Sequence, residues 1–194
     1  HDFSAASAAL GVDLCRRLPE LSHIDPQRLL YSLVRSRAQG EHGVYARIAP
    51  LRFAGGATEL IRRRGRHRET WRQPQLVHEG REILYLVHFF VPRFLRLPFE
   101  RKLATLVHEL YHVSGACDGD IRRFAGRNFA HGASRASYNR IVDRLMQGYL
   151  ASGPDPELLA FLHLDEGGWL QREYRLTGLT VPLPRPRLVA RERL

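Results

Sequence analysis

Hydrophobic positions recur at helical spacing at both ends of the chain. Near the N-terminus, an Ala- and Leu-rich stretch predicts a helix over residues 3–18. Asp25 and Pro26 form a typical helix start, an N-cap residue followed by proline. Four apolar residues follow at helical spacing: Leu29, Leu30, Leu33 and Val34. A second helix is therefore predicted from Pro26 to about Ala38.

The middle of the chain has β-branched and aromatic residues in short runs, which is typical of strands. Residues 44–54 and 82–91 are predicted to form two of them. A third strand is predicted over residues 70–77. Glu79-Gly80 has the composition of a tight turn, so this third strand and the one beginning at residue 82 are predicted to form a hairpin.

From Phe99 onward the pattern returns to the helical period. Its apolar face predicts a helix that ends at Gly115 and comprises Leu103, Leu106, Val107, Leu110 and Val113. Ser134 is a candidate N-cap for the next helix, and residues 154–164 are predicted to form a short one. The order of helices, a small sheet and further helices predicts an α+β fold.

We expect residues 1–178 to form a single domain. Residues 179–194 are rich in proline and arginine and are predicted to be an extended C-terminal segment. The chain has 194 residues, of which 44% are hydrophobic and 26% charged, as in an ordinary soluble protein. No apolar run approaches the roughly 18 residues needed to cross a bilayer, so no membrane partner is expected.

The two cysteines, Cys15 and Cys117, are too few for a disulfide framework. The N-terminal residues also lack the basic region and long apolar stretch of a signal peptide. Both features favour a reducing, cytoplasmic location.

The formal net charge is +10, and one segment concentrates it: Arg62, Arg63, Arg64, Arg66 and Arg68. Clustered arginines can bind the phosphates of a nucleic acid. The alternative is a mobile, solvated loop between strands. The second interpretation gains weight because Lys102 is the only lysine, and such a bias often reflects base composition. Both interpretations remain open.

His108, Glu109 and His112 form the pattern His-Glu-x-x-His within the helix predicted after the sheet. Histidines four positions apart project from one helix face, so both imidazoles can bind one metal ion. Glu109 lies about 100° further round the helix, near the open position of such a metal. A carboxylate there can take a proton from water that zinc has made more acidic. The pattern therefore predicts a zinc site with Glu109 as catalytic base.

The segment HELYHVSGACDGDIRRFAGRNFAHG, residues 108–132, resembles metallopeptidases encoded in phage and bacterial genomes that are related to the SprT-like zincins. In that family HELxH is followed by DGDxRR and then by His-Gly. The similarity extends upstream and covers most of residues 13–150. The resemblance implies a zincin-like fold, a zinc cofactor and a peptide or protein substrate.

A catalytic zinc usually has three protein ligands, so a third ligand is required. His131, followed by glycine, matches the histidine that SprT-like proteins have at the entry to the next helix. Asp118 completes the pattern H-E-x-x-H-x-x-G-x-x-D of metzincins. Those proteins also need a methionine turn, whereas Met146 lies in a helical pattern. Asp120 is a further alternative.

Other polar residues are candidates for orienting the ligands. An aspartate that does not bind zinc can accept the ring N–H of a ligating histidine or pair with Arg122 or Arg123. Tyr138 can donate to a developing oxyanion. By contrast, we expect His88 to be a hydrogen-bonded core histidine and Tyr111 to pack in the core.

Two functions remain open. The first is a zinc-dependent hydrolase in which the strand at residues 83–91 is an edge that adds an extended peptide. The second is a zinc-stabilised module that binds nucleic acid or protein without catalysis. A structural zinc is normally closed by four side chains, and Cys117 beside Asp118 keeps that alternative open.

Overall fold

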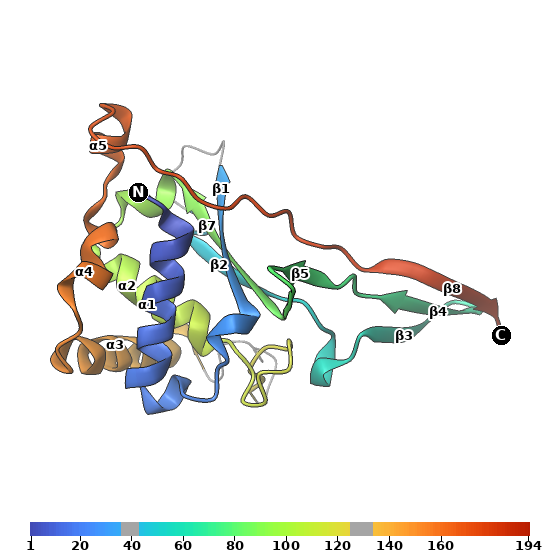
Figure 1. The fold of residues 1–194 in the computed structure, drawn as a ribbon. Coiled ribbons are helices and arrows are strands. Elements are labelled where there is room, and N and C mark those ends of the chain that lie inside the picture. Colours follow the sequence, from blue (N-terminus) through green and yellow to red (C-terminus); the bar gives the residue numbers. More distant parts are fainter. Residues whose placement is uncertain (36–42, 125–133) are drawn as a thin grey trace.

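The computed structural model describes residues 1–35, 43–124 and 134–194. It is a mixed α+β structure, and Figure 1 shows the helices gathered on one side of the molecule. The α-helices are α1 (Phe3–Arg17), α2 (Phe99–Tyr111), α3 (Arg135–Ala151), α4 (Pro156–Leu159) and α5 (Glu166–Leu170). The strands are β1 (Leu29–Arg35), β2 (Ala46–Pro50), β3 (Glu59–Arg64), β4 (His67–Arg72), β5 (Leu76–His78), β6 (Arg81–Ile83), β7 (Tyr85–Val91) and β8 (Arg187–Arg193). The α+β class predicted from the sequence is confirmed.

The central sheet has the strand order β1-β7-β2. β7 lies in the middle, parallel to β1 and antiparallel to β2. One face of this sheet packs against α1, α2 and α3 around a cluster of buried aromatic rings that includes Phe3, Phe89 and Phe94. The other face buries a smaller cluster beneath the β5–β6 hairpin and the C-terminal segment. The sheet therefore fixes α2 against β2, where the predicted zinc site lies.

The helices with strong apolar periodicity are confirmed. The predicted helix over residues 3–18 is α1, and Ser134 caps α3 by accepting the N–H of Ser137. The helix predicted from Phe99 is α2, which ends at Tyr111 rather than at Gly115, so Val113 lies outside it. The short helix at residues 154–164 is present as α4 followed by a 3-10 turn. The turn at Glu79-Gly80 is also confirmed, since it joins β5 to β6 with both residues at positive φ.

The predicted helix from Pro26 to Ala38 is wrong over the residues that are described. Pro26–Arg28 forms a single 3-10 turn, capped by the Asp25 side chain, and β1 begins directly after it. The first five residues of β1 are all buried. A strand of a parallel pair such as β1 and β7 is buried on both faces of the sheet, so its sequence is a continuous apolar run. Periodicity alone cannot distinguish such a run from a buried helix. Residues 36–42 lie outside the described part of the chain.

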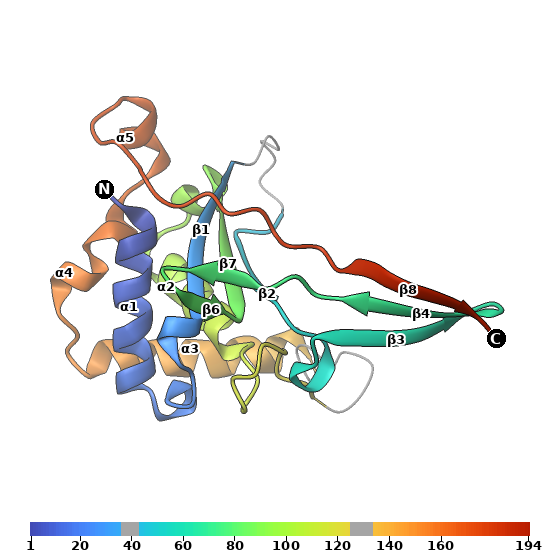
Figure 2. The ribbon, with the colours of Figure 1, turned by 45° about the vertical axis from the view of Figure 1, so that its right-hand side comes forward.

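The arginine-rich segment forms strands rather than the mobile loop considered above. β3 and β4 are joined by a two-residue turn at Gly65-Arg66, and β8 from the C-terminus pairs with the other side of β4. We call this three-stranded sheet the arm. Figures 1 and 2 show it extending away from the helices, with the C-terminus at its tip. The C-terminal segment predicted to be extended thus ends as a strand of the arm.

Before reaching the arm, the C-terminal segment runs along β1. The Leu33 N–H donates to the Leu179 carbonyl, and the Val181 N–H donates to the Ser32 hydroxyl. His88 is buried and hydrogen-bonds through Nε2 to the Val181 carbonyl oxygen at 2.9 Å. This confirms the expectation that His88 is a hydrogen-bonded core residue. Among the described helices, none is long and apolar enough to cross a membrane.

Candidate metal centre

The two histidines of the His-Glu-x-x-His pattern meet at the C-terminal end of α2. His108 lies in the last turn and His112 is the C-cap residue, still in a helical conformation. Their Nε2 atoms are 3.1 Å apart. Two imidazole nitrogens bound to one tetrahedral zinc at 2.0–2.1 Å lie about 3.3 Å apart. The described geometry therefore fits two ligands of one metal ion.

Glu109 is buried beside this pair and is held by the edge strand β2. Its Oε2 accepts the backbone N–H of Ile48 at 2.7 Å. Burial raises the pKa of Glu109 to about 7, although the Ile48 hydrogen bond and the nearby Arg47 charge both lower it. A carboxyl with a pKa near neutrality can accept and return a proton at physiological pH.

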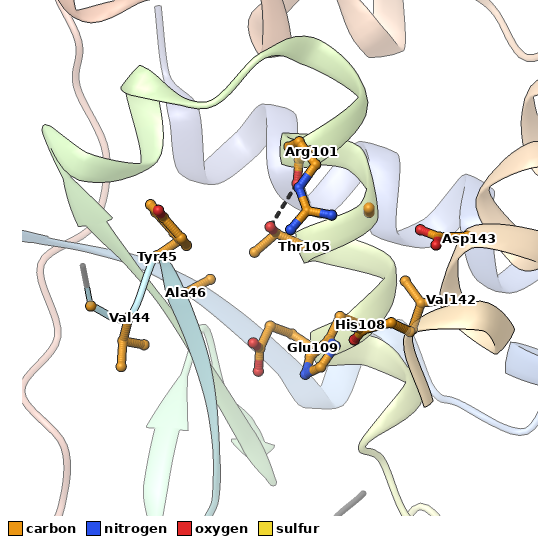
Figure 3. Close-up of a pocket in the computed structure, with 12 residues that line it drawn as sticks. Val44, Tyr45, Ala46, Arg101, Thr105, His108, Glu109, Val142 and Asp143 are labelled. Atoms are coloured by element: carbon orange, nitrogen blue, oxygen red, sulfur yellow. Dashed lines mark hydrogen bonds between the residues drawn. The ribbon is translucent and has the colours of Figure 1, made fainter. Parts of the chain in front are cut away.

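A cavity of about 340 Å³ opens in front of His108 and Glu109. β2 and the residues before it form one wall, and α2 and α3 form the other. Figure 3 shows the His108 and Glu109 side chains at the same end of this cavity, with Val44, Tyr45 and Ala46 opposite α2. The cavity brings the predicted catalytic residues into contact with a space that can hold a ligand.

Tyr138 from α3 packs against both histidine rings. Its ring lies parallel to His112, with centroids 5.1 Å apart, and edge-on to His108 at 4.8 Å. The hydroxyl donates to the His108 carbonyl oxygen at 3.3 Å. Tyr138 therefore orients the histidines by packing and through the backbone. Tyr111 is buried against Tyr138, in agreement with the expected core role.

The segment after α2 folds back on itself. Val113 and Ile121 form an antiparallel bridge, and the N–H of Arg122 donates to the carbonyl of His112 at 2.6 Å. The Arg122 guanidinium lies over the Tyr111 ring, 4.2 Å from its centroid. These contacts support the end of α2 from outside the cavity.

Asp118 and Asp120 are engaged within this returning segment. Asp118 Oδ1 accepts the Ser114 hydroxyl at 2.6 Å and the Asp120 N–H at 3.1 Å. Asp120 forms a two-point ion pair with Arg123 and accepts the N–H of Gly55 at the base of the arm. Burial by itself raises the pKa of Asp120, but the hydrogen bonds from Arg123 and the backbone outweigh it and hold the pKa below its ordinary value. The aspartate–arginine pairing considered from the sequence is thus present for Arg123.

His131 lies outside the described residues, so its place relative to the pair is not part of this structure. Within residues 1–35, 43–124 and 134–194, no group of three or more His, Cys, Asp or Glu side chains is arranged to hold a metal ion. Asp118 and Asp120 accordingly do not form such a group with His108 and His112.

Sequence reasoning did not single out several residues that line the cavity. Arg101 and Thr105 precede His108 by seven and three positions, so helical spacing alone places them on the same face of α2. That signal was available. The residues before β2 carried no such signal, because their position depends on which strand lies at the edge of the sheet.

No family model, curated protein or solved structure matches this chain.

Proposed function

We propose that the protein is a zinc-dependent hydrolase of the zincin type that cleaves a peptide or protein substrate. His108 and His112 would bind the metal, and His131 is proposed as the third ligand on the resemblance of the DGDxRR…His-Gly segment to SprT-like proteins. Glu109 is proposed as the catalytic base. The observation that carries the proposal is the Nε2–Nε2 distance of 3.1 Å beside a buried glutamate at the end of a cavity.

Zinc, when bound, makes a coordinated water more acidic and polarises a substrate carbonyl. Glu109 would take the proton from the attacking water and then give it to the leaving amine. The Ile48 N–H holds the Glu109 carboxylate in place, and burial keeps its pKa near the value that this proton transfer needs. Tyr138 holds the histidine rings and keeps water away from one side of the pair.

The strand that would bind an extended peptide differs from the one predicted. β7, at residues 85–91, is paired on both sides, so the expectation that it forms the edge is wrong. β2 is the edge strand on the cavity side. The backbone N–H and C=O groups of its odd-numbered residues point toward β7, as the hydrogen bond from the Phe90 N–H to the Tyr45 carbonyl shows. Those of its even-numbered residues point away from β7, and the Ile48 N–H accordingly donates to Glu109. The backbone of Ala46 faces the same way and supports peptide binding by β-augmentation, while the Val44 carbonyl before the strand accepts a hydrogen bond from Arg93 at 3.2 Å.

The test of the base is Glu109→Gln, with Glu100→Gln as the matched control. Glu100 is exposed in the first turn of the same helix. We expect Glu109→Gln to keep its zinc content, measured by mass spectrometry, and to lose at least about 100-fold of the cleavage rate on an unfolded protein. Glu100→Gln should retain both. A Glu109→Gln protein that cleaves as fast as the parent would refute the role of Glu109.

The third ligand is tested by zinc content in His131→Ala and Asp118→Ala. Loss of zinc only in His131→Ala would support the SprT-like arrangement. Loss only in Asp118→Ala would instead indicate the metzincin pattern and require the returning segment to rearrange, because Asp118 is bonded to Ser114. Parent protein without zinc would contradict the proposal as a whole.

A further inference from the structure

The arm carries most of the net charge of the protein. Residues 59–72 and 187–193 contain nine arginines and three glutamates, which is +6 of the formal +10. Every residue of β3 is exposed, and β8 is exposed at all but one position. Figures 1 and 2 show the arm extending away from the helices. Its surface is therefore available to a large partner.

Of the five arginines of the arm that form no ion pair within 4.0 Å among the described residues, four lie at its end and the fifth, Arg187, lies at its base. The three glutamates pair with the other arginines of the arm, in the ion pairs Arg72–Glu59, Arg62–Glu69, Arg191–Glu69 and Arg68–Glu192. In the part of the chain that is described, four arginines at the end of the arm form no ion pair within 4.0 Å. We call them the tip cluster: Arg63, Arg64, Arg66 and Arg193.

The pairing of the strands adds to this concentration of charge. Arg63 lies directly opposite Arg68, and Arg72 lies directly opposite Arg187. Like charges at facing positions destabilise a sheet. A bound polyanion would remove that repulsion, and this makes the arm suited to a partner with closely spaced negative charges.

We propose that the arm binds the phosphate backbone of duplex DNA without sequence preference. DNA carries about one negative charge per 1.7 Å of helix axis, so each arginine on the face of the arm that meets the duplex has a phosphate nearby. Side chains on one face of a strand recur about every 6.8 Å, and neighbouring strands are about 4.8 Å apart. The arm is thus a narrow array of guanidinium groups. It needs no metal and does not depend on the proposed hydrolase activity.

Duplex DNA fits the arm better than single strands or duplex RNA. Single-strand binding relies on exposed aromatic rings that stack on bases. Trp71, the one tryptophan, tyrosine or phenylalanine of the arm, lies under the Arg62 guanidinium at 4.6 Å and donates its N–H to Glu69. The arm is a three-stranded sheet, and sheets as well as two-stranded ribbons bind in the grooves of B-DNA, whereas the major groove of duplex RNA is too deep and narrow for side chains to enter.

A second copy of the chain is the competing partner. The arm exposes several apolar side chains, among them Ile61, Leu188 and Val189. They lie on strands that also carry most of the arginines of the arm, so two arms that approach each other would repel. The charge therefore favours DNA over self-association.

The test uses the full chain, a fluorescent DNA duplex of arbitrary sequence and a series of salt concentrations. The tip variant is Arg63→Gln, Arg64→Gln, Arg66→Gln and Arg193→Gln. The matched control has the same net charge and changes four exposed arginines away from the arm to glutamine: Arg140, Arg144, Arg172 and Arg175. A third variant replaces the tip cluster with lysine. Circular dichroism and thermal unfolding verify that each variant is folded.

We expect the parent to bind with a strong dependence on salt. The tip variant should bind roughly 10- to 100-fold more weakly, with a salt slope smaller by about 2–3, because each arginine that contacts a phosphate contributes about one unit and Arg63 lies on the opposite face of the sheet from Arg64. The control and the lysine variant should stay close to the parent. Equal losses in the tip variant and the control would overturn the proposal, as would absent or salt-independent binding by the parent. Equal affinity for duplex RNA or single strands would overturn the assignment to duplex DNA, and self-association lost with the tip cluster would assign the arm to a second copy.

Discussion

Two buried carboxylates show how residue environment moves a pKa in opposite directions. Glu109 has one backbone donor, and burial raises its pKa to about 7. Asp13 in α1 is also buried, and burial alone raises its pKa as well. Hydrogen bonds from Arg16, Tyr149 and Arg17 outweigh that effect and hold the pKa of Asp13 below its ordinary value of 3.8. Glu109 is thus suited to exchanging a proton, whereas Asp13 is suited to remaining charged.

Asp13→Asn should destabilise the fold by about 1–3 kcal/mol at neutral pH, because the amide cannot satisfy the two arginines and Tyr149 as the carboxylate does. A carboxyl whose pKa is lower in the folded state than in the unfolded state stabilises the fold fully at pH values above its unfolded pKa. This stabilisation is lost as the pH falls through its folded pKa. The difference in unfolding free energy between parent and variant should therefore be constant above about pH 5 and become smaller as the pH falls below 3.8. Urea unfolding at several pH values measures it. Glu157→Gln, an exposed change, is the control, and a difference that widens in acid would contradict the assignment.

At the scale of elements, the sequence correctly predicted the helices that bury one face, because a single buried face produces a regular spacing of apolar residues. α2 is such a helix, and its pattern also located His108, Glu109 and His112. β1 was predicted as a helix because a strand buried on both faces has no alternation to read. β2 was predicted approximately, but its place at the edge depends on pairing with β7, which no local pattern records. The Glu109–Ile48 contact, 61 residues apart, was therefore out of reach of sequence reasoning.

The C-terminal segment is held to β1 by side chains that the sequence did not single out. Ser32 is 1% exposed, and its hydroxyl accepts the Val181 N–H at 2.9 Å. Ser32→Ala removes that acceptor, so we expect a loss of about 1 kcal/mol in the free energy of unfolding. Trypsin should also cut faster after Arg187, which follows the released attachment, whereas the bond after Arg185 resists trypsin because Pro186 comes next. Ser22→Ala removes an exposed hydroxyl and should change neither result. Unchanged proteolysis of Ser32→Ala would show that the remaining backbone contacts hold the segment without it.

At the scale of the whole molecule, both ends of the chain are tied to the same body. The Phe3 N–H donates to the Thr177 carbonyl, and the C-terminal segment continues past β1 to complete the arm. The His108–His112 pair lies where α2, α3 and β2 meet. A metal bound there would link elements that are far apart in sequence, and it would bind the folded chain in preference to the unfolded one.

Zinc should therefore raise the thermal midpoint of the parent protein. At a free zinc concentration 100 times the dissociation constant, binding contributes about 2.7 kcal/mol, which is roughly 5–10 °C for a chain of this size. His108→Ala should lose this shift, whereas His78→Ala in the β5–β6 hairpin should keep it. Scanning calorimetry with and without a chelator measures both. The histidine pair does not bind the metal if zinc leaves the midpoint of the parent unchanged or raises that of His108→Ala equally. The short distance between the two Nε2 atoms would then be a hydrogen bond between histidines at the end of an amphipathic helix.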